Sequence, residues 1–294
     1  MTTRPKPTRS RAAGVTRALS LACLALLLVA SGGWRATRAE TPAAADCFSL
    51  DDLAPDERAR AETLFLALLD SEALYTVACD LKPMSGGYVR FQFDAAQPDL
   101  TDIEATRRRL MRFRCGDLFY ADVLVFAAAY DGKRQAEGVV FNRRALERAI
   151  RAHAGYFAPF GVTPNAHPMD ALKTVEHAER ALRWRGYGYL FGYPDAAVDF
   201  FVAAGESQDA TGKFVERDFL HIPSYARATG AFTWAVPKGH RETDAEKRLR
   251  AEAMAVLENY RARRAQLIGD GKPGVVALLR ELAQRPGAKP AARP

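Results

Sequence analysis

Asp131 and Gly132 lie between two apolar segments, and this arrangement limits the fold more than any other feature of the chain. Residues 118–130 precede the dipeptide and residues 135–141 follow it. Asp-Gly favours a type I′ turn, because both central residues need a positive φ and the twist of this turn suits two antiparallel strands. The sequence therefore predicts a β-hairpin. Its first strand is apolar over most of its length, so we expect it in the centre of a sheet.

Further strands are indicated by alternation and by β-forming residues. Tyr88 to Phe93 alternates with a period of two, which is typical of a half-buried strand. Residues 214–222 and 230–236 are two more strand candidates, joined by a longer turn. The segment Ser85-Gly86-Gly87, just before the first of these strands, predicts a turn.

Apolar residues with a helical period indicate helices in most of the remaining segments. Asn142 is the expected N-cap of one helix, and residues 101–104 and 243–246 have the spacing of capping boxes. The helix that begins near Thr243 is expected to continue to Gly269. Because strands and helices do not alternate strictly, we expect an α+β fold, with a largely antiparallel sheet of about four to six strands packed by several helices and a long C-terminal helix.

The N-terminus has the three parts of a secretory signal peptide. Residues 1–17 hold five basic residues and no acidic ones, residues 18–30 form a mainly apolar run of thirteen positions, and small residues follow. This run is shorter than the ~20 residues that a membrane-spanning helix needs. We therefore expect residues 1–39 to be a cleaved signal peptide, and the mature protein to be periplasmic or secreted without stable membrane insertion.

The remainder of the chain divides by composition. Residues 40–54 form an alanine-rich leader and residues 285–294 a tail rich in proline and alanine, both predicted to be disordered around a single globular domain, 55–284. The chain has 42 basic and 35 acidic residues, but seven of the basic residues and none of the acidic ones lie in residues 1–39. The mature protein is therefore formally neutral, which argues against a nucleic-acid partner.

Three cysteines, Cys47, Cys79 and Cys115, lie beyond the expected cleavage site. Outside the cytoplasm, three cysteines predict one disulfide and one free thiol, and all three pairings stay open. The chain contains no CxxC motif, and its five histidines are never at the spacing of a metal motif. We therefore expect no metal site and no cofactor.

Residues 181–195 combine glycine and tyrosine as no other segment does. Three glycines and three tyrosines fall between positions 186 and 193. Their GxGxxxG spacing, after a helix, argues against a dinucleotide loop, which follows a strand and has the spacing GxGxxG. We expect instead a junction between two helices, at which the glycines permit close packing.

The tyrosines of this segment have two interpretations. They could pack in the core with their hydroxyl groups at the surface. Alternatively, Tyr187, Tyr189 and Tyr193, together with Asp195, could line a pocket for a small-molecule, sugar or peptide ligand.

Two other segments contain residue types that catalyse reactions. Lys238 and His240 precede the capped helix at 243, where backbone amides and cationic side chains can bind an anionic group, although such loops commonly face solvent. Glu72, Lys82 and Ser85 are types used as base, electrophile and nucleophile. Ser85 does not lie in a G-x-S-x-G elbow, and the lysine comes three residues before it, so a structural turn is the favoured interpretation.

These features favour an exported binding or structural protein of the cell envelope, with a ligand pocket around the tyrosines. The alternative is a hydrolase that uses Lys238 and His240 with a carboxylate such as Glu72 or Asp195. The sequence leaves open whether the protein is an enzyme.

The export hypothesis predicts where the mature chain begins. Cleavage after Ala36, after Ala39 or after one of the alanines at 43–45 leaves an N-terminus between residues 37 and 46. Mass spectrometry of the exported protein measures this position directly. An exported chain that still begins with Met1 would contradict the hypothesis.

Overall fold

The computed structural model describes residues 46–284, all of which belong to one compact unit of the chain. They form a mixed structure of helices and strands. The predicted signal peptide, the first part of the predicted leader and the predicted tail lie outside the described residues. Within residues 46–284, no helix has the combination of length and apolar character that spanning a membrane requires.

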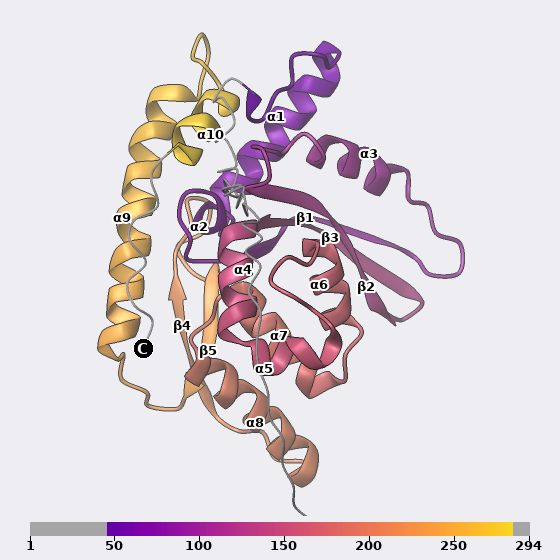
Figure 1. Cartoon of the computed structure of the whole chain (residues 1–294), viewed down its shortest axis with the longest axis vertical. Coiled ribbons are helices and arrows are strands. Elements are labelled where there is room, and N and C mark those ends of the chain that lie inside the picture. The colour runs from indigo at the N-terminus through magenta and orange to yellow at the C-terminus, as the bar shows by residue number, and fades with distance from the viewer. Residues whose placement is uncertain (1–45, 285–294) are drawn as a thin grey trace, which may run out of the picture. The chain divides into compact units, whose positions relative to one another are not determined.

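The elements follow one another as shown in Figure 1. The strands are β1 (Met84–Asp94), β2 (Phe119–Tyr130), β3 (Lys133–Asn142), β4 (Arg217–Ile222) and β5 (Phe232–Pro237). The helices are α1 (Pro55–Asp70), α2 (Leu74–Val77), α3 (Thr101–Leu110), α4 (Arg143–Ala152), α5 (Ala154–Phe157), the 3-10 helix η2 (Ala158–Phe160), α6 (Pro168–Glu176), α7 (Arg180–Phe191), α8 (Asp195–Thr211), α9 (Asp244–Leu267) and α10 (Val275–Ala283).

The predicted hairpin is confirmed: β2 and β3 are antiparallel and are joined at Asp131 and Gly132. Both turn residues have a positive φ, 49° and 73°, as a type I′ turn requires. The expected place of the apolar strand was wrong. The order of the sheet is β1-β3-β2, so β3 is central and β2 is an edge strand. Helices α3 and α6 pack against β2 and cover its apolar residues in place of a second neighbouring strand.

The expected turn at Ser85-Gly86-Gly87 is also wrong, because these residues belong to β1. Between Gly86 and Arg90 the strand advances four residues while β3 advances only two, from Val139 to Glu137. Extra residues of this kind form a β-bulge, which bends a strand and redirects its side chains. Gly87 has a φ of 78°, a conformation that glycine adopts without a steric penalty. The glycines therefore form a bulge inside the strand.

A second sheet consists of β4 and β5 alone, paired antiparallel from Arg217↔Pro237 to Ile222↔Phe232. The described residues thus hold sheets of three and two strands, and the expectation of a single sheet of four to six strands was wrong. Helices α4 to α8 lie between the two sheets in the sequence. Helix α8 packs on β5 and α9 packs on β4.

Helix caps were predicted with mixed success. The Asn142 side chain accepts a hydrogen bond from the Ala145 amide and caps α4, as expected. Thr243 and Glu246 form the predicted capping box of α9, the long helix near the C-terminus. The box predicted for residues 101–104 is absent from the described structure, because α3 begins with Leu100 as its N-cap and the Asp99 carboxylate accepts from the Thr101 amide.

The three-stranded sheet separates two hydrophobic clusters. Val123 of β2 belongs to a cluster with residues of α1, α2, α9 and α10, whereas Leu124 belongs to one with residues of α4, α6 and α7. Successive side chains point to opposite faces of a strand. Helices therefore cover both faces of the sheet, and α7, which carries the glycine–tyrosine segment, lies on the second face.

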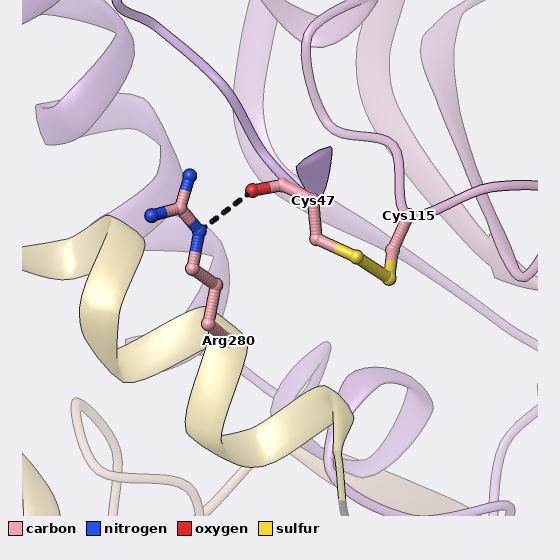
Figure 2. Close-up of a disulfide and its surroundings, with 3 residues drawn as sticks. All are labelled: Cys47, Cys115 and Arg280. Carbon is pink, nitrogen blue, oxygen red and sulfur yellow. Dashed lines mark hydrogen bonds between the residues drawn. A yellow bond between two sulfur atoms is a disulfide. The ribbon is translucent and has the colours of Figure 1, made fainter. Parts of the chain in front are cut away.

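Cys47 and Cys115 form a disulfide, and Cys79 is the free cysteine among the described residues (Figure 2). The Arg280 guanidinium of α10 donates a hydrogen bond of 3.0 Å to the Cys47 carbonyl. The Cys79 thiol donates to the Tyr75 carbonyl, and burial raises the pKa of this thiol to about 12. One pairing of the three is thus formed, and the remaining thiol is unreactive at neutral pH.

We expect the disulfide to stabilise the fold strongly, because it closes a loop of 68 residues and so restricts the unfolded chain. Replacing both Cys47 and Cys115 by alanine should lower the free energy of unfolding by about 4 kcal/mol. Chemical denaturation measures this loss, and Cys79→Ala, which keeps the disulfide, is the control. A double variant as stable as the control would contradict the assignment.

Candidate functional site

The glycine–tyrosine segment forms a continuous helix. Residues 180–191 are helical in α7, and Gly192 ends the helix in the left-handed conformation with a φ of 72°. The expected junction between two helices therefore lies only at residues 192–194, between α7 and α8. We expected a break because glycine lowers the stability of a helix by ~1 kcal/mol relative to alanine. In α7 the packing of the helix against its neighbours offsets this loss, so the helix continues through Gly186 and Gly188.

The internal glycines let α7 approach its neighbours closely. A Cβ atom on Gly186 would lie 2.7 Å from a methyl group of Val175 in α6, and one on Gly188 would lie 2.5 Å from a methyl group of Val198 in α8. Both distances are too short for a real side chain. The packing interpretation of the sequence therefore holds for the glycines of α7.

Gly192 makes a third close approach, to the segment between α2 and β1. A Cβ atom there would lie 2.7 Å from the Leu81 carbonyl oxygen. The flanking rings of Phe191 and Tyr193 are thereby held against Lys82. The C-terminal end of α7 thus brings the glycine–tyrosine segment into contact with the segment from Glu72 to Lys82.

The four predicted binding residues fall into two groups. Tyr187 and Tyr193 line a cavity between α7, α8 and β5. Tyr189 instead stacks on His153, with ring centroids 3.7 Å apart, and His153 lies 3.5 Å from the Asp195 carboxylate. The structure therefore brings Tyr187 and Tyr193 together at the cavity and places Tyr189 and Asp195 elsewhere.

The cavity has a volume of about 260 Å³. Its walls consist mainly of aromatic and small apolar side chains from α7, α8, β4 and β5 and from Tyr193, which lies between α7 and α8. The lining residues are Trp184, Tyr187, Gly188, Phe191, Tyr193, Ala197, Val198, Phe201, Phe219, Thr233, Trp234 and Ala235.

One wall of this cavity could have been found in the sequence. Trp184, Gly188 and Phe191 recur at the helical spacing i, i+4, i+7, so they share one face of α7. Trp234 and Phe219 come from the β4–β5 hairpin, and no local pattern connects them to α7. Their contribution depends on how the hairpin packs on the helices.

Aromatic side chains continue from the cavity to the protein surface. Phe219 lines the cavity and is 57% exposed, and Phe214 is 63% exposed. The Arg217 guanidinium lies 4.5 Å from the ring centroid of Phe214. Large exposed apolar groups beside a cavity are typical of a ligand entrance, because soluble proteins otherwise bury them.

Lys82 lies against the other side of the cavity wall and has no exposed surface. Its Nζ is 4.0 Å from the ring centroid of Phe232, 5.1 Å from that of Phe191 and 5.4 Å from that of Tyr193. The nearest acidic group is the Glu72 carboxylate, at 3.5 Å. Burial lowers the pKa of Lys82 and Glu72 partly offsets this effect, so the surroundings favour the neutral amine.

The Lys82 amine pairs with Glu72 at 3.5 Å, a distance too long for a good hydrogen bond, and among the described residues it makes no hydrogen bond of ordinary geometry. Burying an ammonium group without hydrogen bonds costs several kcal/mol, even beside a carboxylate. The cation–π contacts return only about 2 kcal/mol each when desolvated. Buried ionisable groups of this kind are concentrated at functional sites.

Glu137 is a second buried acidic group near this region. Its carboxylate lies over Gly86, where a Cβ atom would be 2.6 Å from Oε1. Burial raises the pKa of Glu137 to about 7, an effect that the partly exposed Arg90 at 3.9 Å reduces and that Glu72 and Glu176 increase. The bulge of β1, expected as a turn, thus makes room for a carboxylate that titrates near neutral pH.

Glu176 connects this acidic region to the cavity. The Tyr187 hydroxyl, on the cavity wall, donates a hydrogen bond of 2.6 Å to the Glu176 carboxylate. The Ala127 amide donates to the other oxygen at 2.8 Å. The hydroxyl of Tyr187 is therefore occupied and orients its ring, and it is not free to bind a ligand.

Of the catalytic trio considered from sequence, only Glu72 and Lys82 meet. The Ser85 hydroxyl is buried and lies 2.8 Å from the Thr76 hydroxyl, and it also contacts the Glu72 carbonyl. These contacts fasten the start of β1 to α2. The structural interpretation therefore accounts for Ser85.

Lys238 and His240 lie in the loop before α9 and do not line the cavity. Lys238 Nζ and the Gly239 amide both bind the Asp218 carboxylate at 2.8 Å. His240 Nε2 lies 2.9 Å from the Glu246 carboxylate, the group that completes the capping box of α9. Each residue thus has a partner with a local structural role, and the hydrolase alternative stays a prediction.

Comparison with protein-family models, with curated proteins and with solved structures finds no match for this chain. Among residues 46–284, no three or more histidine, cysteine or acidic side chains are grouped so that they could hold a metal ion. The functional argument therefore depends on the geometry of the cavity and of the groups around it.

Glu137 should make the stability of the protein depend on pH. The folded state holds the proton of this carboxyl group more tightly than the unfolded chain does, so its contribution to stability is lost as pH rises from about 4.5 to about 7. We expect wild type to lose about 2 kcal/mol more than Glu137→Gln between pH 5 and pH 7.5. Urea denaturation at a series of pH values measures this difference.

Glu258→Gln, on an exposed position of α9, is the matched control and should follow wild type. Parallel curves for wild type and Glu137→Gln would show that Glu137 titrates as an ordinary surface carboxylate.

Proposed function

We propose that the protein is an exported binding protein whose ligand is a small apolar compound with one or two rings. The observation that carries this proposal is the cavity between α7, α8 and β5, lined by Trp184, Phe191, Tyr193 and Trp234. Small-molecule sites are typically concave, mainly apolar and formed before the ligand binds.

The size of the cavity favours a compact ligand. An engineered apolar cavity of ~150 Å³ holds benzene, so about 260 Å³ accommodates one or two fused rings. Of the ligand classes considered from sequence, sugars fit less well, because they need many hydrogen-bond partners and the Tyr187 hydroxyl is already bound to Glu176. Aromatic rings interact best with apolar rings in offset or edge-to-face contacts.

Two further features support this function. Phe219 extends the aromatic lining to the surface, which gives the ligand a route of entry. The Cys47–Cys115 disulfide is the kind of bond that persists outside the cytoplasm, which agrees with the signal peptide expected for residues 1–39. We therefore place the binding function in the periplasm or in the extracellular medium.

A ligand screen combined with a cavity-filling variant tests the proposal. Compounds with one or two rings, including 2-naphthalenemethanol, are expected to raise the melting temperature, because a ligand that binds only the folded state stabilises it. Ala197 lines the cavity and is 5% exposed, so Ala197→Leu fills part of the space. This variant should weaken binding about tenfold or more, equal to about 1.4 kcal/mol.

The matched control is Ala196→Leu, which makes the same change at the neighbouring exposed position of α8. Isothermal titration calorimetry gives the dissociation constant for each protein. If the screen yields no ligand, or if Ala197→Leu and Ala196→Leu bind a ligand equally well, the cavity is not the binding site.

A further inference from the structure

The end of α7 joins the cavity to the buried amine of Lys82. Phe191 and Tyr193 line the cavity, and the same two rings lie 5.1 Å and 5.4 Å from Lys82 Nζ. The amine therefore lies directly behind two side chains of the cavity wall. Both rings belong to partly exposed residues, so their rotation would open a path from the cavity to Nζ.

The surroundings of Lys82 are those of a reactive amine. Nζ has no hydrogen-bond partner among the described residues that would occupy its lone pair, and three aromatic rings exclude water from it. A lysine in an apolar pocket is more often neutral, and a neutral amine is the form that attacks a carbonyl carbon. The Glu72 carboxylate lies 3.5 Å from Nζ, close enough to accept a proton from the amine and to return one.

A structural role explains Lys82 poorly. Methionine has a similar length and would fill the same space between the rings without burying a charge. A fully buried lysine whose one acidic partner is Glu72, beside an apolar cavity, points to chemistry at that site.

We infer that Lys82 captures a ring-bearing aldehyde or ketone as a reversible imine, with the rings of the ligand in the aromatic cavity and its carbonyl carbon bonded to Nζ. This inference rests on the proposed binding function and specifies its ligand class. It assigns the cavity to the apolar part of the ligand and the Lys82–Glu72 pair to the carbonyl group.

The chemistry balances within these groups. The lone pair of the neutral amine forms a bond to the carbonyl carbon, and one amine proton passes through Glu72 to the former carbonyl oxygen, giving a carbinolamine. Loss of the second amine proton and of the hydroxyl group as water then leaves a C=N bond. In each step Glu72 accepts a proton from the nitrogen and delivers it to the oxygen, first to the carbonyl oxygen and then to the leaving hydroxyl, so no oxidant or reductant takes part.

Reductive trapping with 2-naphthaldehyde tests the inference on the full-length mature protein. Sodium cyanoborohydride reduces an imine to a stable secondary amine, which peptide mass spectrometry locates. We expect one naphthylmethyl group per chain, on Lys82, at neutral pH and at an aldehyde concentration that leaves the exposed Lys238 unmodified. Lys82→Met should abolish this product while retaining the fold, because methionine fits the same space.

Two further variants separate a reactive site from an accidental one. Phe191→Ala removes one ring from the wall, and it should make trapping at Lys82 roughly tenfold faster. Glu72→Gln keeps the amine but removes the proton acceptor, and it should slow trapping about tenfold or more. Lys238→Arg removes an exposed lysine and should leave the rate unchanged.

Modification of exposed lysines alone, in wild type and in Phe191→Ala, would overturn the inference. The alcohol 2-naphthalenemethanol has the same rings but forms no imine, and its binding is measured in parallel. Binding of the alcohol without trapping of the aldehyde would leave the binding function intact and remove only the imine. Absence of both would remove the binding function as well.

Discussion

The close packing of α7 determines how the rest of the candidate site is arranged. Its backbone approaches α6 at Gly186, α8 at Gly188 and the Leu81 carbonyl at Gly192. A methyl group at any of these positions would separate two elements that now touch. Because Gly192 also ends the helix, the two rings beside it, Phe191 and Tyr193, lie between the cavity and Lys82. The close approach of the α7 backbone at its glycines thus determines where the neighbouring aromatic side chains lie.

Local signals in the sequence predicted local structure well. The Asp131-Gly132 hairpin and the Thr243 capping box depend on neighbouring residues only, and both are confirmed. The division into two sheets was missed, because it depends on which strand edges the helices cover. For the site, the sequence singled out the segment that contains Tyr187 and Tyr193, which line the cavity, but Trp234 reaches the cavity through tertiary packing that no spacing reveals.

Buried polar groups in this protein fall into two kinds. Asn142 and Ser85 are buried and fully engaged, since each bonds to α2 and fastens the sheet to it. Lys82 and Glu137 are different, because burial shifts the pKa of each, downwards for the lysine and upwards for the carboxyl group. The first kind follows from folding alone, because a buried donor or acceptor must be bonded. The second kind costs stability, and Lys82 lies against two rings that line the cavity, which connects it to the proposed function.

The bond between Arg280 and the Cys47 carbonyl joins positions 233 residues apart. A chain that crosses a membrane from its N-terminus delivers Cys47 first and α10 last. Cys115 becomes available long before Arg280, so oxidation can precede the docking of α10. If the chain is exported as proposed, the disulfide holds the segment around Cys47 beside α3 and β2 before α10 emerges, and α10 then packs against a region that is already cross-linked. The order of synthesis therefore matches the order in which the Cys47–Cys115 disulfide and then the Arg280–Cys47 hydrogen bond can form.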